Sequence, residues 1–309
     1  MDTATAEPAI IAFIGVWALA IITVWYCASI LLEMALYRRF GPKEYDYADG
    51  LASFTVNLMS SFSELFIRAF VPLAAYLFIY ASWRLFDVGF AWWTIPLAFA
   101  VHECAYYLGH VIGHRTGLGW AFHQPHHSSE ELNLSTASRG FLFGDPVASM
   151  LGLTAALIGI HPVVYVGVVT VKNMWGIWNH TQLIGKMGWA DRWLATPANH
   201  RVHHGRNPQY IDKNYSQVTI VLDRLFGTFE PEVEAPDFGL VEPQITTNPV
   251  TIWLSGWRWL GRRIASAPDL KTKLKYLYKP PEWHHESKVE GCAQGRCGPG
   301  HGEGFVAAE

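Results

Sequence analysis

The sequence predicts an all-α fold, a bundle of about four membrane-spanning helices or hairpin equivalents capped on its cytoplasmic side by histidine-rich helices. Half of the 309 residues are hydrophobic and only 16% are charged, so the chain is more apolar than an ordinary soluble domain. Long apolar runs alternate with polar segments in which histidines recur at helical spacing. The net charge of -3 and the four scattered cysteines indicate neither a nucleic-acid partner nor a disulfide framework.

The first apolar run, residues 8–32, is long enough to cross a hydrocarbon layer of about 30 Å. Arg38, Arg39 and Lys43 follow it, and cytoplasmic flanks collect such basic residues. We therefore expect the N-terminus outside and the segment after the helix inside. The run lacks a cleavage site of the signal-peptide type, so we expect a retained anchor.

Shorter apolar runs follow. Residues 69–83 and 88–101 predict a hairpin of two helices that returns the chain to the cytoplasmic side. The mixed stretch 50–68 fits either an interfacial helix or the inner end of the second span. Residues 147–171 are long enough for one span, but a hairpin bent near His161 and Pro162 would begin and end on the same side, and we expect the hairpin. Only the hairpin leaves the histidines before and after it on one side of the membrane.

Three histidine motifs indicate the chemistry of the protein. Motifs HVIGH at 110–114, HQPHH at 123–127 and HRVHH at 200–204 place histidines three or four residues apart, on one face of a helix. Neutral imidazole is a good ligand for iron, zinc and copper, and so many of them exceed the needs of one tetrahedral zinc ion. We therefore expect two metal ions. The candidate ligands are His110, His114, His123, His126, His127, His180, His200, His203 and His204.

The remaining histidines lack such clustering. His102, His161, His284, His285 and His301 are expected to have ordinary structural roles. HECAY at 102–106 is not the HExxH motif of a zinc protease, because position 106 is tyrosine.

The histidine segments resemble the fatty acid hydroxylase and sterol desaturase superfamily of integral membrane di-iron enzymes. The matching stretches are residues 103–115, 120–139, 178–183 and 196–232, and LKYLYKPPEW at 274–283 is similar to bacterial members. The resemblance implies that the three motifs bind two irons at the cytoplasmic face. It also implies that His180 is the additional histidine found between the second and third motifs.

Three further residues are candidates for holding the ligands in place. Glu103 stands where family members often have aspartate, two helical turns before His110, and a carboxylate there would orient a histidine N–H. Asn199 and Asn214 are candidates for the same role, although asparagine in turn-rich sequence is more often a cap or a turn former. No catalytic residue beyond the metal ligands is expected.

The resemblance implies activation of O2 and hydroxylation or desaturation of a C–H bond in an apolar lipid: a sterol, a fatty acyl chain or an ether lipid. Phe99, Tyr106, Tyr107 and Trp175 are candidates for lining the substrate cavity. The chain has no flavin or dinucleotide fingerprint, so the two electrons must come from a separate donor. That donor is expected to be a cytochrome b5-like or ferredoxin-like protein with its reductase, or a reduced pterin, as in the alkylglycerol monooxygenases.

A membrane transporter or sensor that binds zinc, and a zinc hydrolase of membrane lipids, are the competing interpretations, and zinc can substitute for iron at such ligands. The apolar runs carry almost none of the ionisable residues that transport would need. We expect one integral membrane oxygenase domain over residues 1–285, with its histidine core at about 100–232. Residues 286–309 are expected to form a disordered glycine-rich tail.

Overall fold

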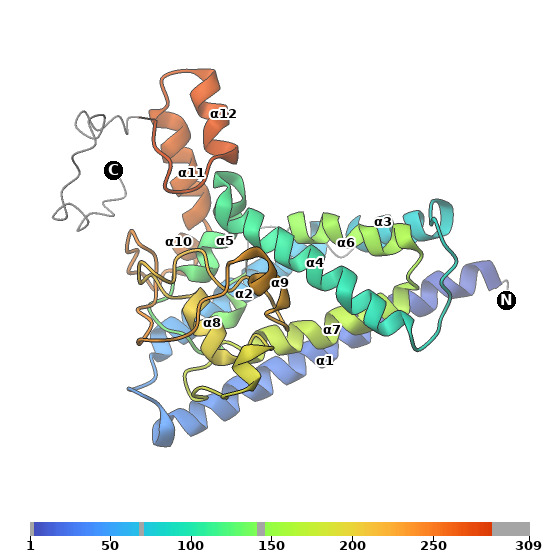
Figure 1. Ribbon diagram of the computed structural model, residues 1–309, viewed down its shortest axis with the longest axis horizontal. Helices are drawn as coiled ribbons and strands as arrows, with labels where there is room; N and C mark the ends of the chain where they lie inside the picture. The colour runs from blue at the N-terminus through green and yellow to red at the C-terminus, as the bar shows by residue number, and fades with distance from the viewer. Residues whose placement is uncertain (1–2, 68–70, 141–145, 286–309) are drawn as a thin grey trace.

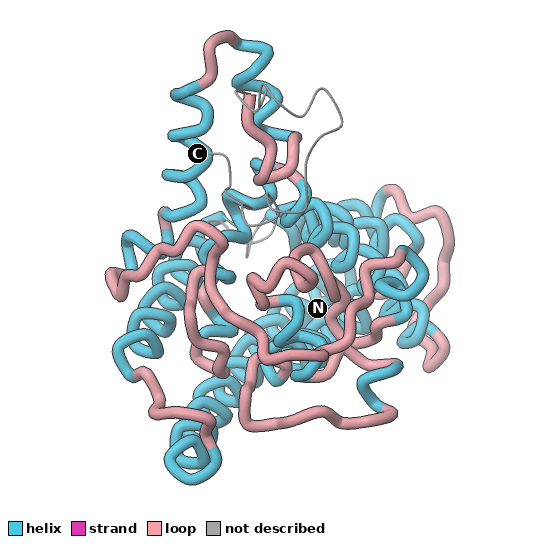
Figure 2. Tube along the Cα trace, turned by 60° about the vertical axis from the view of Figure 1, so that its left-hand side comes forward, coloured by secondary structure: helices cyan, strands magenta, loops and turns pink. Residues whose placement is uncertain are grey.

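A computed structural model describes residues 3–67, 71–140 and 146–285 of the chain. Over these residues the chain forms twelve α-helices and two short 3-10 helices, and its only β pairing is two isolated bridges. Figure 2 shows helices and loops throughout the described part. The predicted all-α fold is therefore confirmed, while the predicted disordered tail, 286–309, lies outside the described residues.

The long helices run back and forth along one axis. α1 (Thr3–Phe40) spans the length of the molecule, and α2 (Tyr47–Ile67) and α3 (Val71–Ser82) run back in the opposite direction. α4 (Thr94–Arg115) then runs in the same direction as α1 (Figure 1). The helix expected over 88–101 thus begins later than predicted and continues through the first histidine motif. Gly89, with a φ of +66°, lies in the non-helical segment before α4.

The apolar stretch 147–171 forms two helices, α6 (Pro146–Ile158) and α7 (Pro162–Trp178), and the chain reverses between them. Gly159 has a φ of +98°, and a Cβ there would lie 1.9 Å from the carbonyl oxygen of Phe86, so only glycine fits this turn. The His161 side chain accepts a hydrogen bond from the Val163 N–H and caps α7, whose first residue is a proline. This is the bend that Pro162 predicts.

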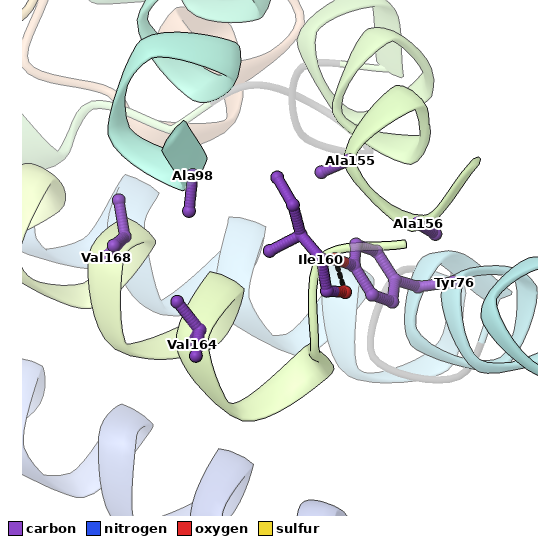
Figure 3. Close-up of a cluster of buried hydrophobic side chains, with 7 residues drawn as sticks. All are labelled: Tyr76, Ala98, Ala155, Ala156, Ile160, Val164 and Val168. Carbon is purple, nitrogen blue, oxygen red and sulfur yellow. Dashed lines mark hydrogen bonds between the residues drawn. The ribbon is translucent and has the colours of Figure 1, made fainter. Parts of the chain in front are cut away.

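A hydrophobic cluster joins α3, α4, α6 and α7 (Figure 3). Ile160 is fully buried in it, and its carbonyl accepts a 2.9 Å hydrogen bond from the Tyr76 hydroxyl. Farther along, a Cβ on Gly109 would lie 2.8 to 2.9 Å from the atoms of Ala148, so α4 and α6 approach closely there. This contact fixes the position of the turn of α4 that carries His110.

Residues 14–40 of α1 form the one helix, among the described residues, that is long and apolar enough to cross a membrane. Large apolar side chains along it are exposed, including Val16 at 67% and Val24 at 69%. Two more apolar helices, residues 73–83 and 146–158, are shorter. Length and composition thus identify one candidate span rather than about four.

The end of the bundle toward which α1, α4 and α7 run carries the shorter helices (Figure 1). These are α5 (Gly117–His127), α8 (Pro197–His203) and α9 (Val221–Phe226), followed by α10 (Pro249–Trp253), α11 (Ser255–Ser266) and α12 (Leu270–Tyr278). α11 and α12 pack against α5 through a second cluster centred on Trp259 and Tyr276, and they project to one side of the molecule (Figures 1 and 2).

Candidate metal centre

Four segments bring the candidate histidines to one end of the bundle. The HVIGH motif ends α4, HQPHH ends α5, and HRVHH lies on α8 and its C-terminal cap. His180 follows α7 by two residues. The nine predicted residues therefore meet although 94 positions separate the first, His110, from the last, His204.

The nine histidines form two groups, and within each group the ligand atoms all lie within 4.8 Å of one another. Eight of the nine side chains are buried, and His126 is half-buried. The first group is His110, His114, His123, His127 and His203; the second is His126, His180, His200 and His204.

Each HxxHH motif contributes to both groups. In the α5 motif, His123 and His127 belong to the first group and His126 to the second. In the α8 motif the assignment is reversed, because His200 and His204 belong to the second group and His203 to the first. Successive residues of an α-helix are rotated by about 100°, so the adjacent histidines of each motif point to different groups while the first and last share one.

The spacing of the ring nitrogens fits ligation of metal ions. In the first group, His123 Nε2 lies 3.0 Å from both His110 Nε2 and His127 Nε2. In the second, His200 Nε2 lies 2.9 Å from His180 Nε2 and 3.1 Å from His204 Nε2. Two imidazoles bound at right angles on a metal at roughly 2.1 Å have their nitrogens about 3.0 Å apart.

Two ring nitrogens in the first group have no partner in the structure. His114 Nε2 and His203 Nε2 are buried and make no hydrogen bond. Buried polar atoms normally have a partner, and a metal ion is one explanation for an exception. The donor set therefore fits two metal ions.

Burial keeps the histidines of α5 and α8 in the state that binds metal. It lowers the pKa of all six well below 6.5, and the neighbouring imidazoles lower the pKa further. The rings are therefore neutral near pH 7, and a neutral ring nitrogen can donate its lone pair to a metal. The six are His123, His126, His127, His200, His203 and His204.

Backbone carbonyls orient the rings by accepting hydrogen bonds from Nδ1. The acceptor for His110 is Tyr215 O at 2.6 Å, and the acceptor for His203 is Lys213 O at 2.9 Å. His180 Nδ1 donates to Gly176 O at 2.8 Å. A donating Nδ1 leaves the Nε2 lone pair free to face the group, as is usual for metal-bound histidine.

Asp212 is a functional candidate that the sequence analysis missed. Its Oδ1 lies 3.5 Å from His114 Nδ1, and its other oxygen pairs with Arg115. Burial raises the pKa of Asp212, but the hydrogen bonds and charges of His114 and Arg115 outweigh this effect and hold the pKa below its ordinary value. The sequence signal for it is the acidic residue of IDKNY, two positions before the candidate Asn214.

The expected supporting asparagines act through the backbone. Asn214 has a φ of +54° and donates hydrogen bonds to Asn199 O at 3.0 Å and Glu230 O at 2.7 Å, so it fixes the loop that presents the Lys213 and Tyr215 carbonyls. Asn199 donates to Leu194 O at 2.8 Å and so ties α8 to the segment before it. Their hydrogen bonds in the described residues go to the backbone rather than to a histidine.

Asp223 completes this support, and the sequence analysis did not assign it a role. Its side chain is fully buried and accepts hydrogen bonds from the N–H groups of Tyr215 and Ser216, at 2.8 and 3.0 Å. The Thr228 hydroxyl donates to the same carboxylate at 2.7 Å. The carboxylate thereby fixes the segment whose Tyr215 carbonyl orients His110.

Glu103 differs from the expectation. Within the described residues it forms a buried ion pair with Lys172 and accepts hydrogen bonds from Thr219 N at 2.7 Å and Val218 N at 3.2 Å, rather than from a histidine N–H. Seven residues of helix separate it from His110, a rise of about 10 Å, and this distance exceeds the reach of a glutamate side chain. Glu103 therefore fixes the backbone of residues 218–219 and does not orient a candidate ligand histidine.

The other described histidines lie outside both groups, as expected. His102 stacks near Tyr106, His161 caps α7, and His284 and His285 lie beside Tyr276. His301 lies outside the described residues.

Two cavities are candidates for binding a substrate. One, of about 620 Å³, touches histidines of both groups: His114, His127 and His204. The other, of about 350 Å³, is an apolar groove between α4 and α7. Of the predicted lining residues, Phe99 and Trp175 line the groove, while Tyr106 packs on His110 and Tyr107 stacks on Phe226.

Residues 95–228 match the family model described as fatty acid hydroxylase. The chain is 35% identical over 275 residues to the alkylglycerol monooxygenase of Homo sapiens, covering 84% of this chain and 59% of that protein. The Xenopus tropicalis alkylglycerol monooxygenase is 33% identical over 264 residues, covering 84% and 58%. The ornithine lipid hydroxylase OlsE of Rhizobium tropici is 28% identical over 150 residues, covering 47% and 45%.

The chain thus spans a little under three fifths of the length of these alkylglycerol monooxygenases. No solved structure matches it. The segment that matches the family model contains all nine histidines of the two groups. Over residues 95–228, the chain is similar to the fatty acid hydroxylase family.

Proposed function

We propose that this chain is a membrane-bound, O2-dependent lipid hydroxylase with a di-iron centre. The observation that carries the proposal is the pair of histidine groups, in which each HxxHH motif is divided between the two sites. One tetrahedral zinc ion takes four ligands, so nine neutral nitrogen donors in two adjacent groups fit two metal ions better than one. The relatives named monooxygenase and hydroxylase support hydroxylation over desaturation.

The proposed overall reaction is R–H + O2 + 2 e⁻ + 2 H⁺ → R–OH + H2O. The two groups of histidines would hold two irons, which when bound supply the activation of O2 for attack on an unactivated C–H bond. The chain's own residues supply the rest: the carbonyls of Gly176, Lys213 and Tyr215 fix ring orientation, and burial excludes bulk water. Such fixed ligands with oriented N–H groups hold a metal more tightly than free rings do.

The substrate we propose is an apolar lipid, with ether lipids favoured because four of the matched relatives are alkylglycerol monooxygenases. The two electrons would come from a separate donor. A cytochrome b5-like or ferredoxin-like protein with its reductase is the first candidate, and a reduced pterin, which the family resemblance also allows, is the second.

We also propose a multi-pass arrangement with the histidines on the cytoplasmic side. α1, α4 and α7 all run toward the histidine-bearing end, and α1 ends there in Arg38 and Arg39. A tag inserted between His180 and His200 tests this arrangement. It should be reached from the cytoplasmic side, and labelling of the tag on intact cells would refute the placement.

The function itself is tested on protein purified in mild detergent after growth with iron. We expect about two irons per chain and O2 uptake that depends on a lipid and a reductant. One zinc per chain and no O2 uptake would refute the oxygenase in favour of a zinc-binding protein. Lipid profiling of a deletion strain would identify the substrate class.

A further inference from the structure

The 620 Å³ cavity is lined both by residues within the segment that matches the family model and by residues beyond it. The residues within the segment include His114, His127 and His204, from both histidine groups. The residues beyond position 228, where the family match ends, include Glu242, Trp259 and Arg263. The chain therefore adds its own C-terminal helices to a space that opens on the candidate metal centre.

Two buried polar groups that line this cavity lack partners. Gln124 Oε1 is a hydrogen-bond acceptor, Arg263 Nη1 is a donor, and neither makes a hydrogen bond in the structure. The side chains of Gln124 and Arg263 are 7% and 9% exposed. Arg263 uses its other terminal nitrogen, Nη2, to bind Glu242 at 3.2 Å. Buried groups of this kind are normally satisfied, so a ligand with both an acceptor and a donor fits here.

The cavity is amphipathic. Its apolar lining residues include Val111, Ile211, Leu240 and Val241. Its charged lining residues nearly balance, since four are basic and three acidic: Arg115, Arg206, Lys213 and Arg263 against Asp212, Glu242 and Glu282. A balanced set gives no strong attraction for a multiply charged anion. An apolar side next to polar groups fits the junction between the head and the chain of a lipid better than a wholly polar solute.

We propose that this cavity binds the polar headgroup of the lipid substrate, an uncharged or zwitterionic head that offers both a donor and an acceptor. Arg263 and Gln124 recognise the head, and the C-terminal helices thereby select the lipid. The proposal rests on the proposed function as a lipid hydroxylase, but binding can be measured without turnover. Trp120 and Trp259 line the cavity, so their fluorescence reports occupancy.

The binding experiment uses the full chain in detergent micelles, titrated with hexadecylglycerol, with hexadecyl methyl ether, which has the same chain but no diol, and with glycerol alone. We expect hexadecylglycerol to change the tryptophan fluorescence at concentrations at which the other two do not. Arg263→Gln should weaken this binding by about ten-fold or more, because a buried hydrogen bond to a charged group is lost. Arg262→Gln, an exposed neighbour on α11, is the matched control and should bind as the wild type does.

A second variant, Val241→Phe, tests the site independently in case Arg263→Gln does not fold. Val241→Phe fills the cavity from a residue that is 44% exposed, and it should weaken binding of hexadecylglycerol while leaving the melting temperature and iron content unchanged. In turnover, both variants should lower the kcat/KM for hexadecylglycerol more than the kcat/KM for hexadecyl methyl ether.

The two proposals fail in different ways. The headgroup site would be overturned, even if the protein oxidises lipids, by equal affinity for hexadecylglycerol and hexadecyl methyl ether. It would also be overturned if a folded Arg263→Gln bound hexadecylglycerol with the affinity of the wild type. Binding of glycerol as tight as that of hexadecylglycerol would assign the cavity to a free polar molecule and overturn the lipid proposal. Selective binding by a protein that holds no iron and consumes no O2 would support the site and refute the oxygenase.

Discussion

Replacing Asp212 by asparagine should weaken metal binding at the first histidine group without disturbing the fold. Asp212 has a φ of +59°, and asparagine tolerates this region, so the backbone is preserved. The change removes the charge that faces His114 Nδ1 and leaves Arg115, whose side chain is 51% exposed, in contact with solvent. Solvent screening makes that second loss a small one.

The size of the effect follows from the geometry. Loss of a group that supports a metal-bound ligand typically costs between about 10-fold and 100-fold in metal affinity. The oxygen to nitrogen distance of 3.5 Å is at the long limit of a hydrogen bond, so we expect the lower part of that range, about ten-fold. This corresponds to about 1.4 kcal/mol.

The assay is competition for iron between the purified protein and a chelator of known affinity. Asp237→Asn is the matched control, because Asp237 also pairs with an arginine, Arg206, but its side chain is 62% exposed. We expect the first of the two irons to leave Asp212→Asn at about ten-fold lower chelator concentration than it leaves the wild type or the control. Equal iron retention by all three proteins would refute the role assigned to Asp212.

Three further predictions follow from the site and the packing. His203→Ala and His126→Ala remove one ligand from the first and second group respectively, so each should lower the iron content toward one per chain by metal analysis; full loading of both would contradict the two-group assignment. The metal-free protein should be most stable above about pH 6.5, and its melting temperature should fall as the pH falls below that value. The reason is that histidines whose pKa is lowered in the folded state bind protons more readily in the unfolded state. A melting temperature that stays constant between pH 7 and 5 would contradict this. Gly109→Ala should destabilise the protein by about 1–3 kcal/mol, because the added Cβ would lie 2.8 Å from Ala148. Gly167→Ala is the control, because a Cβ there meets no atom within 4 Å and should not lower the melting temperature. Equal melting temperatures for the two variants would refute the close contact of α4 and α6.

The candidate ligand histidines could be named from the sequence because helical spacing is a local property. Helical spacing of three and four residues brings His123 and His127 to one face whatever the rest of the chain does. The bend near Pro162 was predicted because only a hairpin leaves the histidines before and after it on one side of the membrane. Proline lacks an N–H and is favoured at the first turn of a helix, and Pro162 begins α7.

The division of each HxxHH motif between the two histidine groups was not predicted. It depends on how α5 and α8 are placed relative to each other, and this is set by contacts far apart in sequence. The role of Glu103 was misassigned for the same reason. Its partner, Lys172, lies 69 residues away on α7, and nothing in the local sequence indicates the pairing. Asp212 and Asp223 act on a loop whose path only the folded chain defines.

The sequence by itself determined the all-α class, the nine histidines and the bend between α6 and α7, because helix periodicity, ligand type and proline geometry are properties of short segments. The tertiary structure alone decided which histidines share a group, which carbonyls orient them and which helices line the adjoining cavity. These features depend on distances between segments such as α5, α8 and α11. Such distances are set by packing across the whole bundle and not by any one segment.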